Sequence, residues 1–494
     1  MNKVLSFLGS ILLACFVVPA FYFVSNYPQF GLQDTFLIVA LFGAIALGIS
    51  GLLWLMFRDI NKVSFLMYGG SVVFWFSMPI ALLVQDHMGS MVGFIFRNNY
   101  QWILLFVCCF LSLSILFFVL RYSPKLVECL DKILGVFVLI LSGLLLLNIV
   151  QKFLFEDQNI DVPLQYQFSE GNKQYPNVYH ILLDAHPNQK AMAVIGGDLR
   201  SFYEELNSLG FVTFPESRSN YPATHPSVAS MLNMNYLPED WEGKSTKFFR
   251  SLICNNEVFK NFCKMGYGVH CNLSQNVVVQ DLYGNCQKRN DFKLHALFYT
   301  ILANTPLRHV FLYGLSNSIR LSALQDVNFL IEKINTFKNF YGATMNVCYT
   351  HILCPHEPCI FTEGRESHVR DIFFTKADEM YVLSPETHRN YCKNVYGIDN
   401  LILGSIKEIL KQYEAELVKP IIILHSDHSI LYCGKGLKSP FITSDTVYGN
   451  LFALYVPDEW KQDAKDLKFI NLYRWIFNHL FGDRYEYLKN KQKL

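Results

Sequence analysis

The sequence lacks an excess of charge of either sign. Its 494 residues include 42 basic and 41 acidic side chains, so the formal net charge at pH 7 is +1. This balance gives no indication of a nucleic-acid partner, which would favour a clearly basic surface. Charged residues make up only 17% of the chain, whereas 51% of the residues are hydrophobic. This composition is typical of a protein that lies partly in a membrane.

The sequence also lacks the paired Cys-x-x-Cys spacing of a zinc ribbon, although it contains thirteen cysteines. Four of them lie in or beside apolar N-terminal segments and nine lie after residue 153. Nine is an odd number, so at least one of these thiols has no disulfide partner among the others. Some disulfides are expected in an oxidising compartment, but the spacing does not determine their pairing.

Long apolar segments are concentrated in the first third of the chain. A helix that crosses ~30 Å of hydrocarbon at ~1.5 Å per residue needs about 20 mostly apolar residues. Five segments meet this requirement, at residues 4–25, 35–57, 64–86, 102–120 and 131–152. A cleavable signal peptide would explain only the first of them. We therefore predict a five-helix transmembrane domain over residues 1–153.

The distribution of basic residues predicts the orientation of this domain. With the N-terminus inside, the outer loops carry only Arg97, whereas the inner flanks carry Lys3, Arg58, Lys62, Arg121, Lys125 and Lys132. An odd number of spans then places the rest of the chain outside the cytoplasm. Residues 154–177 are polar and contain two prolines and a glycine, which indicates a linker. Residues 178–494 are long enough for one extracytoplasmic domain with a substantial core.

Short apolar runs alternate with helical patterns in this second part of the chain. We predict strands at 178–183, 346–353, 420–425 and 452–456, and helices at 199–209, 226–233, 256–265 and 398–414. Such alternation favours an α/β domain with a mainly parallel sheet that is covered by helices on both faces. In this architecture, ligands bind at the carboxyl ends of the strands.

Chemically reactive side chains stand at the ends of these predicted elements. Asp184 follows the first strand, Asp427 and His428 follow the strand at 420–425, and Thr224 precedes a helix start at Pro226. Alone, Thr224 could be a helix N-cap and Asp184 a turn residue. Together, two carboxylates, an imidazole and a hydroxyl can hold a divalent metal beside a nucleophilic oxygen. The sequence thus predicts a site for one metal, most suitably Zn²⁺ or Mn²⁺.

The order of these motifs resembles a known superfamily. The strand that ends in Asp184 is followed by segments 219–233, 255–270 and 355–366, by the Ser-Asp-His-Ser run that begins at residue 426, and by segment 450–457. This order is similar to that of the sulfatase-like branch of the alkaline phosphatase superfamily. More narrowly, it resembles membrane-anchored bacterial transferases such as lipid A phosphoethanolamine transferases and lipoteichoic acid synthases. The resemblance implies an alkaline phosphatase/sulfatase-like catalytic domain, periplasmic or otherwise extracytoplasmic, on a bacterial inner (plasma) membrane anchor.

The resemblance also implies roles for individual residues. Asp184, Thr224, Asp427 and His428 correspond to the metal ligands, and Thr224 to a nucleophile that becomes phosphorylated. His356 stands where relatives have a histidine that contacts the phosphoryl group or protonates the leaving oxygen, although it could instead be a structural loop histidine. His351, five residues earlier, is a further candidate for substrate binding.

Some positions depart from the family patterns. Ser429 replaces the glycine that commonly follows the Asp-His pair, and no histidine occurs between His428 and His479. These departures weaken the likeness to lipid A transferases in particular. Ala185 stands where sulfatases usually have another acid, which favours a single metal. His186 and His225 lie beside the proposed ligands in sequence, which alone assigns them no role.

Sulfate-ester hydrolysis is disfavoured by the residues around the nucleophile. Formylglycine-dependent sulfatases need Cys or Ser in C/S-x-P-x-R, whereas Thr224 begins the run Thr-His-Pro-Ser-Val. An alkoxide with one metal suits attack on a phosphodiester. We therefore expect a transferase that moves a phosphoethanolamine- or phosphoglycerol-type headgroup from a membrane phospholipid to a cell-surface glycan or glycolipid through a phosphothreonine. The alternatives are a phosphodiester hydrolase and a catalytically inactive, lipid-binding or regulatory membrane protein of the same fold.

Overall fold

The structure is a computed structural model that describes residues 3–21, 32–75, 123–155, 175–244, 246–274, 308–356, 359–361, 385–430 and 443–489. The chain divides into two compact units. The first consists of Met1–Ile160 and Asn290–Leu315, and the second of Asp161–Arg289 and Ser316–Leu494.

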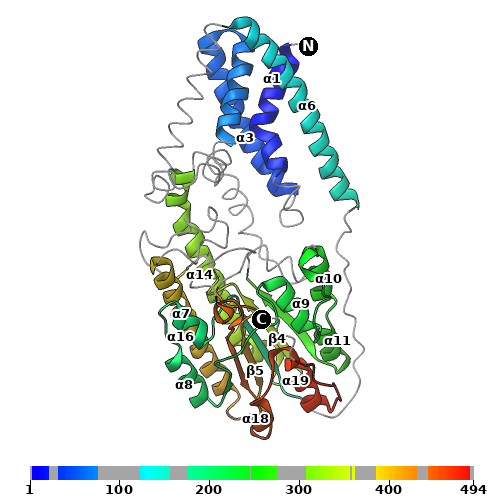
Figure 1. Cartoon of the computed structure of the whole chain (residues 1–494), viewed down its shortest axis with the longest axis vertical. Helices are drawn as coiled ribbons and strands as arrows, with labels where there is room; N and C mark the ends of the chain where they lie inside the picture. The colour runs from blue at the N-terminus through cyan, green and yellow to red at the C-terminus, as the bar shows by residue number, and fades with distance from the viewer. Residues whose placement is uncertain are drawn as a thin grey trace. The chain divides into compact units, whose positions relative to one another are not determined.

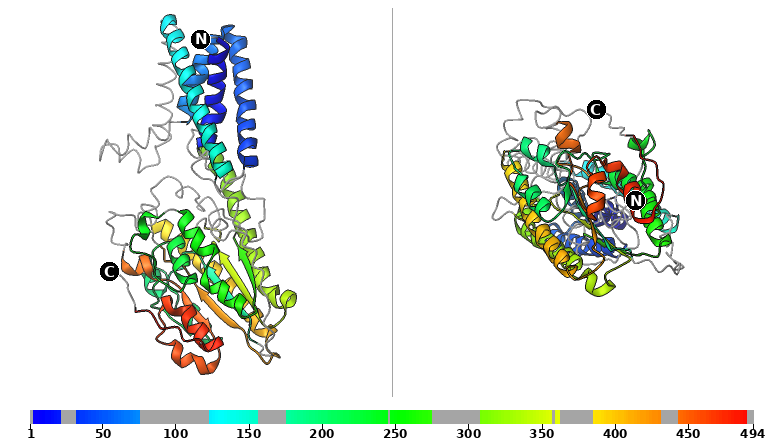
Figure 2. Two further views of the ribbon diagram at one scale, coloured as in Figure 1. Left: turned by 90° about the vertical axis from the view of Figure 1, so that its right-hand side faces the viewer. Right: turned by 90° about the horizontal axis from the view of Figure 1, so that it is seen from below.

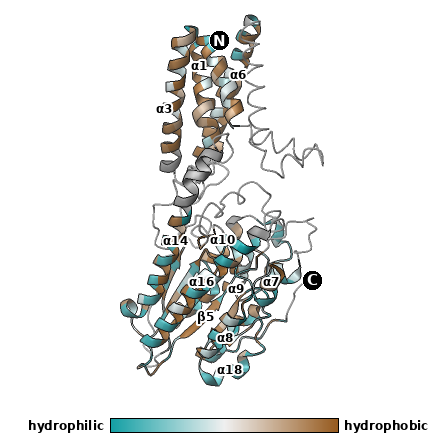
Figure 3. Ribbon diagram, turned by 90° about the vertical axis from the view of Figure 1, so that its left-hand side faces the viewer, coloured by the Kyte–Doolittle hydropathy of each residue, from teal (hydrophilic) through white to brown (hydrophobic). Residues whose placement is uncertain are grey.

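The first unit contains long apolar helices. Its main helices are α1 (Lys3–Leu12), which continues through the π-helix η1 (Leu13–Val17) to residue 21, α3 (Leu32–Phe57) and α6 (Pro124–Phe155). Figure 3 shows that α1, α3 and α6 are hydrophobic along most of their length. Many large apolar side chains are exposed, among them Phe36 (75%) and Leu52 (65%). Helices that are apolar on all sides are stable in hydrocarbon but not in water.

Three of these helical stretches are long and apolar enough to cross a membrane, namely Lys3–Phe21, Phe36–Phe57 and Lys125–Val150. They correspond to the predicted spans at 4–25, 35–57 and 131–152. Of the predicted span at 64–86, only residues up to 75 are described, as part of a helix over 60–75. The predicted span at 102–120 lies outside the described residues.

The second unit is built on a mixed, mostly parallel sheet of six strands. In chain order these are β1 (Val178–Leu183), β2 (Val212–Thr213), β3 (Gly268–Leu273), β4 (Asn346–Ile352), β5 (Ile421–His425) and β6 (Phe452–Tyr455). The spatial order is β2-β6-β5-β1-β4-β3. Strands β5, β1, β4 and β3 are parallel, whereas β6 is antiparallel to both β5 and β2. The prediction of an α/β domain with a mainly parallel sheet is confirmed.

Helices cover both faces of the sheet, as Figures 1 and 2 show. One face carries α7 (Gln189–Val194), α8 (Arg200–Ser208), α14 (Arg308–Tyr341) and α16 (Pro385–Gln412). The other carries α9 (Thr224–Leu232), α10 (Thr246–Cys254), α11 (Glu257–Lys264), α18 (Asp458–Ala464) and α19 (Leu472–Phe481). Successive side chains of a strand point to opposite faces. Accordingly, Ile181 and Leu183 belong to the first core and Val178 and Leu182 to the second, and all four are fully buried.

Several predicted boundaries were wrong in detail. The helix predicted at 226–233 begins two residues earlier, at Thr224, and the helix predicted at 398–414 is only the C-terminal half of α16. Strands β2 and β3 and the long helix α14 were not predicted. Short elements such as α17 (Ser444–Tyr448) and the 3-10 helix η3 (Phe469–Asn471) connect the core elements.

Candidate metal centre

The candidate site lies where three neighbouring parallel strands end. Asp184 directly follows β1, Asp427 lies two residues after β5, and His356 lies four residues after β4. Strands β5, β1 and β4 are adjacent and in register, so that Leu182 of β1 is paired with His425 on one side and His351 on the other. The carboxyl ends of parallel strands meet at one edge of a sheet, as the sequence predicted for this site.

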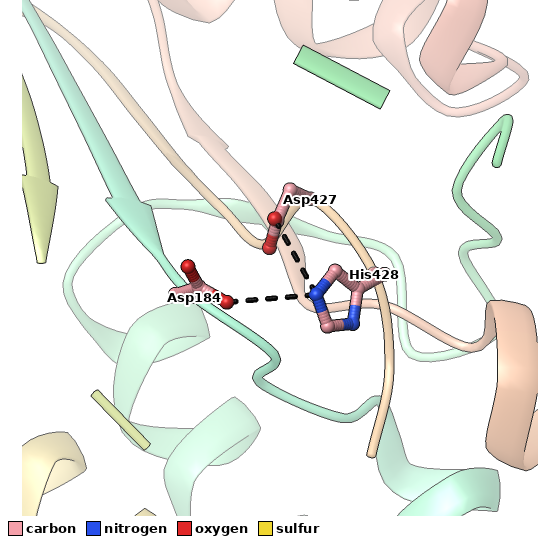
Figure 4. Close-up of side chains that lie close together, drawn as sticks. All are labelled: Asp184, Asp427 and His428. Carbon is pink, nitrogen blue, oxygen red and sulfur yellow. Dashed lines mark ion pairs between the residues drawn. The ribbon is translucent and has the colours of Figure 1, made fainter. Parts of the chain in front are cut away.

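Three of the four predicted ligands come together in this place. One ligand atom each from Asp184, Asp427 and His428 lie within 4.8 Å of one another. Figure 4 shows both carboxylates beside the same nitrogen of His428. Its Nε2 lies 3.5 Å from Asp184 Oδ1 and 3.6 Å from Asp427 Oδ2. All three residues are buried, with relative exposures of 2%, 1% and 7% for Asp184, Asp427 and His428.

The hydrogen bonds of the two carboxylates show that this group could hold a metal. Asp427 Oδ1 accepts a hydrogen bond from the backbone N–H of Ala185 at 3.1 Å, and Asp184 Oδ2 lies 3.3 Å from His351 Nε2. The other oxygens, Asp184 Oδ1 and Asp427 Oδ2, are buried without a hydrogen-bond partner in the described structure. Such buried, unsatisfied oxygens are costly unless a cation neutralises them. One divalent cation between them would satisfy both.

Thr224, the fourth predicted ligand, is close to this group. It is the first residue of α9, and the N-cap position is taken by Ala223, without any side-chain capping bond. The interpretation of Thr224 as an ordinary N-cap is therefore wrong. Its Oγ1 instead lies 3.3 Å from His428 Nε2. A hydroxyl oxygen thus stands beside the two carboxylates and the imidazole.

The surrounding histidines keep Asp184 ionised. Burial by itself raises the pKa of Asp184, but the charge of His356, the hydrogen bond and charge of His351 and the charge of His428 together lower it below its ordinary value. The backbone N–H of His356 also donates a hydrogen bond to the carbonyl oxygen of Asp184 at 3.0 Å. A deprotonated carboxylate is the state that metal binding requires.

The histidines near the site differ in what they contact. His351 is fully buried, and its Nε2 lies 3.3 Å from Asp184 Oδ2. It therefore contacts a candidate metal ligand, Asp184, and is not exposed on a surface that a substrate could reach. Burial lowers the pKa of His225, and the carboxylates of Asp184 and Asp427 oppose that shift. His225 therefore lies near the same carboxylates. Its position next to Thr224, in the first turn of α9, is the sequence feature from which this proximity could have been predicted.

His186 has a different environment. Its Nε2 lies 2.7 Å from Asp399 Oδ1 on α16, and both side chains are buried. Burial raises the pKa of Asp399, an effect that His186 opposes through its charge and hydrogen bond. This pair connects the loop after Asp184 to α16, and neither residue belongs to the group of candidate metal ligands.

Helix α16 contributes other supporting residues that the sequence did not reveal. The side-chain amide of Asn394 donates to Pro355 O at 2.8 Å and accepts from the Ile360 N–H at 2.8 Å, and thereby holds both sides of the loop that contains His356. The hydroxyl of Tyr391 donates to the carbonyl oxygen of Ala185. A polar residue on an otherwise apolar helix face is the only sequence signal for such positions.

No protein-family model and no curated protein matches the chain. Among solved structures, it is similar to the integral membrane lipooligosaccharide phosphoethanolamine transferase A of Neisseria meningitidis, with 13% identity over 97% of this chain and 95% of that chain and a TM-score of 0.40. It is similar to the C-terminal periplasmic domain of phosphoethanolamine transferase EptC from Campylobacter jejuni, with 15% identity, 63% and 92% coverage and a TM-score of 0.37. The corresponding domain of Escherichia coli EptC, solved in complex with Zn, matches with 13% identity, 64% and 84% coverage and a TM-score of 0.36.

Proposed function

We propose that this chain is a metal-dependent transferase. It moves a phospho-headgroup, of the phosphoethanolamine or phosphoglycerol type, from a membrane phospholipid to a hydroxyl of a cell-surface glycan or glycolipid. The observation that carries the proposal is the position of Thr224 Oγ1, 3.3 Å from His428 Nε2 and beside two buried carboxylates with one unsatisfied oxygen each. A site built only for folding would pair these oxygens with hydrogen-bond donors.

In this proposal Asp184, Asp427, His428 and Thr224 would hold one divalent ion, Zn²⁺ or Mn²⁺. When bound, the ion would lower the pKa of the Thr224 hydroxyl and offset negative charge on the phosphoryl group. Thr224 is also the first residue of α9, a helix of nine residues. The backbone N–H groups and the positive end of the helix dipole at this position favour a negatively charged group on the Thr224 oxygen.

The first chemical step attaches the headgroup to the protein. Thr224 loses its hydroxyl proton to water, and its oxygen attacks the phosphorus of the donor. The bond from phosphorus to the diacylglycerol oxygen breaks, and His356 donates a proton to that oxygen, so that diacylglycerol leaves. A positioned general acid of this kind contributes typically ~10²–10⁴-fold to the rate.

The second step reverses the roles. The acceptor hydroxyl attacks the phosphorus of the phosphothreonine and gives its proton to His356, which thus returns to its starting state. The bond between phosphorus and the Thr224 oxygen breaks, and Thr224 recovers a proton from water. In this mechanism His356 would contact the reacting oxygens, whereas the buried His351, whose Nε2 lies 3.3 Å from Asp184 Oδ2, would hold Asp184 in place.

The apolar helices support a lipid donor. Lys3–Phe21, Phe36–Phe57 and Lys125–Val150 are each suited to a bilayer. We propose a multi-pass location in a bacterial inner membrane, with the catalytic domain on the extracytoplasmic side, where donor headgroups and envelope glycans are both present.

Release of diacylglycerol from labelled phospholipid by the purified full-length protein tests the proposal. Thr224→Ala should abolish release with the fold intact. Thr336→Ala is the matched control, because among the described residues the Thr336 hydroxyl is hydrogen-bonded to the Glu332 carbonyl oxygen of its own helix and not to the candidate site. Diacylglycerol release that persists in Thr224→Ala contradicts the mechanism. If the phospholipid carries its label in the headgroup and the labelled headgroup is released into water although glycan acceptors are present, the enzyme is a hydrolase and the proposed transfer is contradicted.

A further inference from the structure

A cavity of about 320 Å³ lies beside the edge strand β2, and none of the residues that line it has been given a role above. Its walls come from residues 213–220, which lead toward Thr224, and from residues 465–470, which connect α18 to η3. The volume lies at the lower end of the range of small-molecule sites, ~300–1,000 Å³. The wall combines one partly exposed aromatic ring, that of Phe214, with several charged and polar side chains.

The cavity lies at the same end of the sheet as the metal centre. Phe214 in its wall stacks on Phe452 at 4.4 Å between ring centroids, and Phe469 lies 5.1 Å from the ring of His425. Phe452 is the register partner of His425, the last residue of β5, and Asp427 follows two residues later. Neighbouring strands are ~4.8 Å apart, so β2, two strands from β5, lies about 10 Å from it.

The chain itself connects the cavity to the proposed nucleophile. Asn220 lines the cavity and lies four residues before Thr224. Four residues span at most about 14 Å even when fully extended. A saccharide that occupies the cavity can therefore extend a hydroxyl toward the phosphothreonine.

The charges in the wall are of two kinds. Arg218 is neutralised by Asp445 at 2.6 Å, and Glu216 by Lys190 at 2.9 Å. The two lysines of the other wall, Lys465 and Lys468, are exposed and form no ion pair with a carboxylate of the described residues. Two lysines that line the cavity thus have no ion-pair partner among the residues that the structure describes.

We propose that this cavity binds an acidic sugar of the acceptor, that is, a saccharide unit that carries a phosphate or a carboxylate. The inference rests on the transferase function proposed above and names the acceptor class. Lys465 and Lys468 would pair with the anionic group through charge-assisted hydrogen bonds. The ring of Phe214 would contact the apolar face of the sugar, and Asn220 and Ser217 line the same cavity with hydrogen-bonding groups.

Binding to the full-length protein in detergent micelles tests the proposal directly. The probes are glucose 6-phosphate, glucuronate, glucose and inorganic phosphate. We expect both acidic sugars to bind more tightly than glucose and than inorganic phosphate. The double variant Lys465→Ala/Lys468→Ala should bind the acidic sugars about 10-fold or more weakly, because two charge-assisted contacts are lost.

The matched control is Lys264→Ala/Lys411→Ala, which removes the same charge from exposed positions on α11 and α16. This control should bind like the wild type. Equal binding by the cavity variant and the wild type, or inorganic phosphate binding as tightly as the sugar phosphate, overturns the proposal. If the control variant binds the acidic sugars as weakly as the cavity variant does, the proposal is also overturned, because the loss of net positive charge would then explain the weaker binding.

A second readout separates this inference from the proposed function. The headgroup adduct on Thr224 is formed from phospholipid alone, and its discharge is then followed after addition of an acidic sugar. The cavity variant should form the adduct at the wild-type rate but discharge it about 10-fold more slowly. If the cavity variant and the wild type discharge the adduct at the same rate, the cavity is not the acceptor site. If the wild type forms no adduct at all, the proposed function fails, whereas the binding experiment still decides whether the cavity binds acidic sugars.

Discussion

Replacement of Asp427 by asparagine changes the charge of the candidate metal centre with little change in shape. The side-chain oxygen can still accept from Ala185 N–H, a bond of 3.1 Å in the structure, and the amide group replaces an oxygen that accepts no hydrogen bond from the described residues. In the metal-free protein, two negative charges separated by 4.8 Å, the upper limit for Asp184 and Asp427, repel by about 3.5 kcal/mol at an effective dielectric constant of about 20. The nearby imidazoles offset part of this repulsion. We therefore expect Asp427→Asn to stabilise the metal-free protein by about 1–3 kcal/mol.

With metal bound, we expect the wild type to be more stable than Asp427→Asn. A ligand that binds only the folded state adds about 4 kcal/mol of stability at 1,000 times its dissociation constant. Loss of even an outer-shell partner lowers metal affinity 10- to 100-fold, or about 1.4–2.7 kcal/mol, and loss of a charged ligand should cost at least as much. Unfolding of the full-length protein is followed with EDTA and then with Zn²⁺ or Mn²⁺, together with the metal content of the folded protein.

Asp466→Asn is the matched control, because Asp466 is exposed and lies outside the metal centre. This control should gain as much stability from metal as the wild type. If Asp427→Asn gains equally, Asp427 is not a ligand. If Asp427→Asn destabilises the metal-free protein, the argument from repulsion between buried carboxylates is refuted.

Three further experiments test other parts of the structure. His356→Ala should slow turnover by about 10²–10⁴-fold and leave the stabilisation by metal in place, so that loss of metal binding instead would make His356 a structural residue. Burial lowers the pKa of His180 and lowers that of His425 to about 3. The folded protein therefore keeps both imidazoles neutral, and their contribution to stability is fully present above the ordinary pKa of 6.5 and is lost as the pH falls toward 3. Urea unfolding of the metal-free protein should show a loss of about 3 kcal/mol from pH 7.5 to 5.5, about 1.4 for each histidine, and a flat profile contradicts this. Asp399→Ala removes the partner of His186 and should cost about 1–3 kcal/mol in the same assay, whereas an unchanged midpoint means that the pair contributes nothing.

The central strands could be predicted from the sequence because parallel strands that are covered on both faces are almost continuously apolar. This is true of β1 (Val178–Leu183) and β5 (Ile421–His425), every residue of which is buried. The edge strands could not be predicted in this way. Strand β2 has only two residues, and β3 (Gly268–Leu273) is half-buried throughout and mixes apolar with polar side chains. Helix α14 was missed because its apolar residues do not form one continuous stripe over its 34 residues.

The clustering of the candidate metal ligands could be predicted because these residues follow strand ends or begin a helix. Asp184 and Asp427 follow β1 and β5, and Thr224 begins α9. The contacts that support these residues could not be predicted, since they depend on register and packing. His351 reaches Asp184 because β4 pairs with β1 so that His351 lies opposite Leu182. No local pattern in the sequence indicates that Asp399 contacts His186, because 213 positions separate them.

The most direct test of the central claim is the mass of the peptide that contains Thr224. Purified, metal-replete protein is incubated with phosphatidylethanolamine or phosphatidylglycerol and then digested, with Thr224→Ala treated in parallel. We expect a phospho-headgroup on Thr224 from one of the two lipids, with a mass that identifies the headgroup, and no such adduct in Thr224→Ala. If the Thr224 peptide stays unmodified while diacylglycerol is released, the phosphothreonine mechanism is wrong.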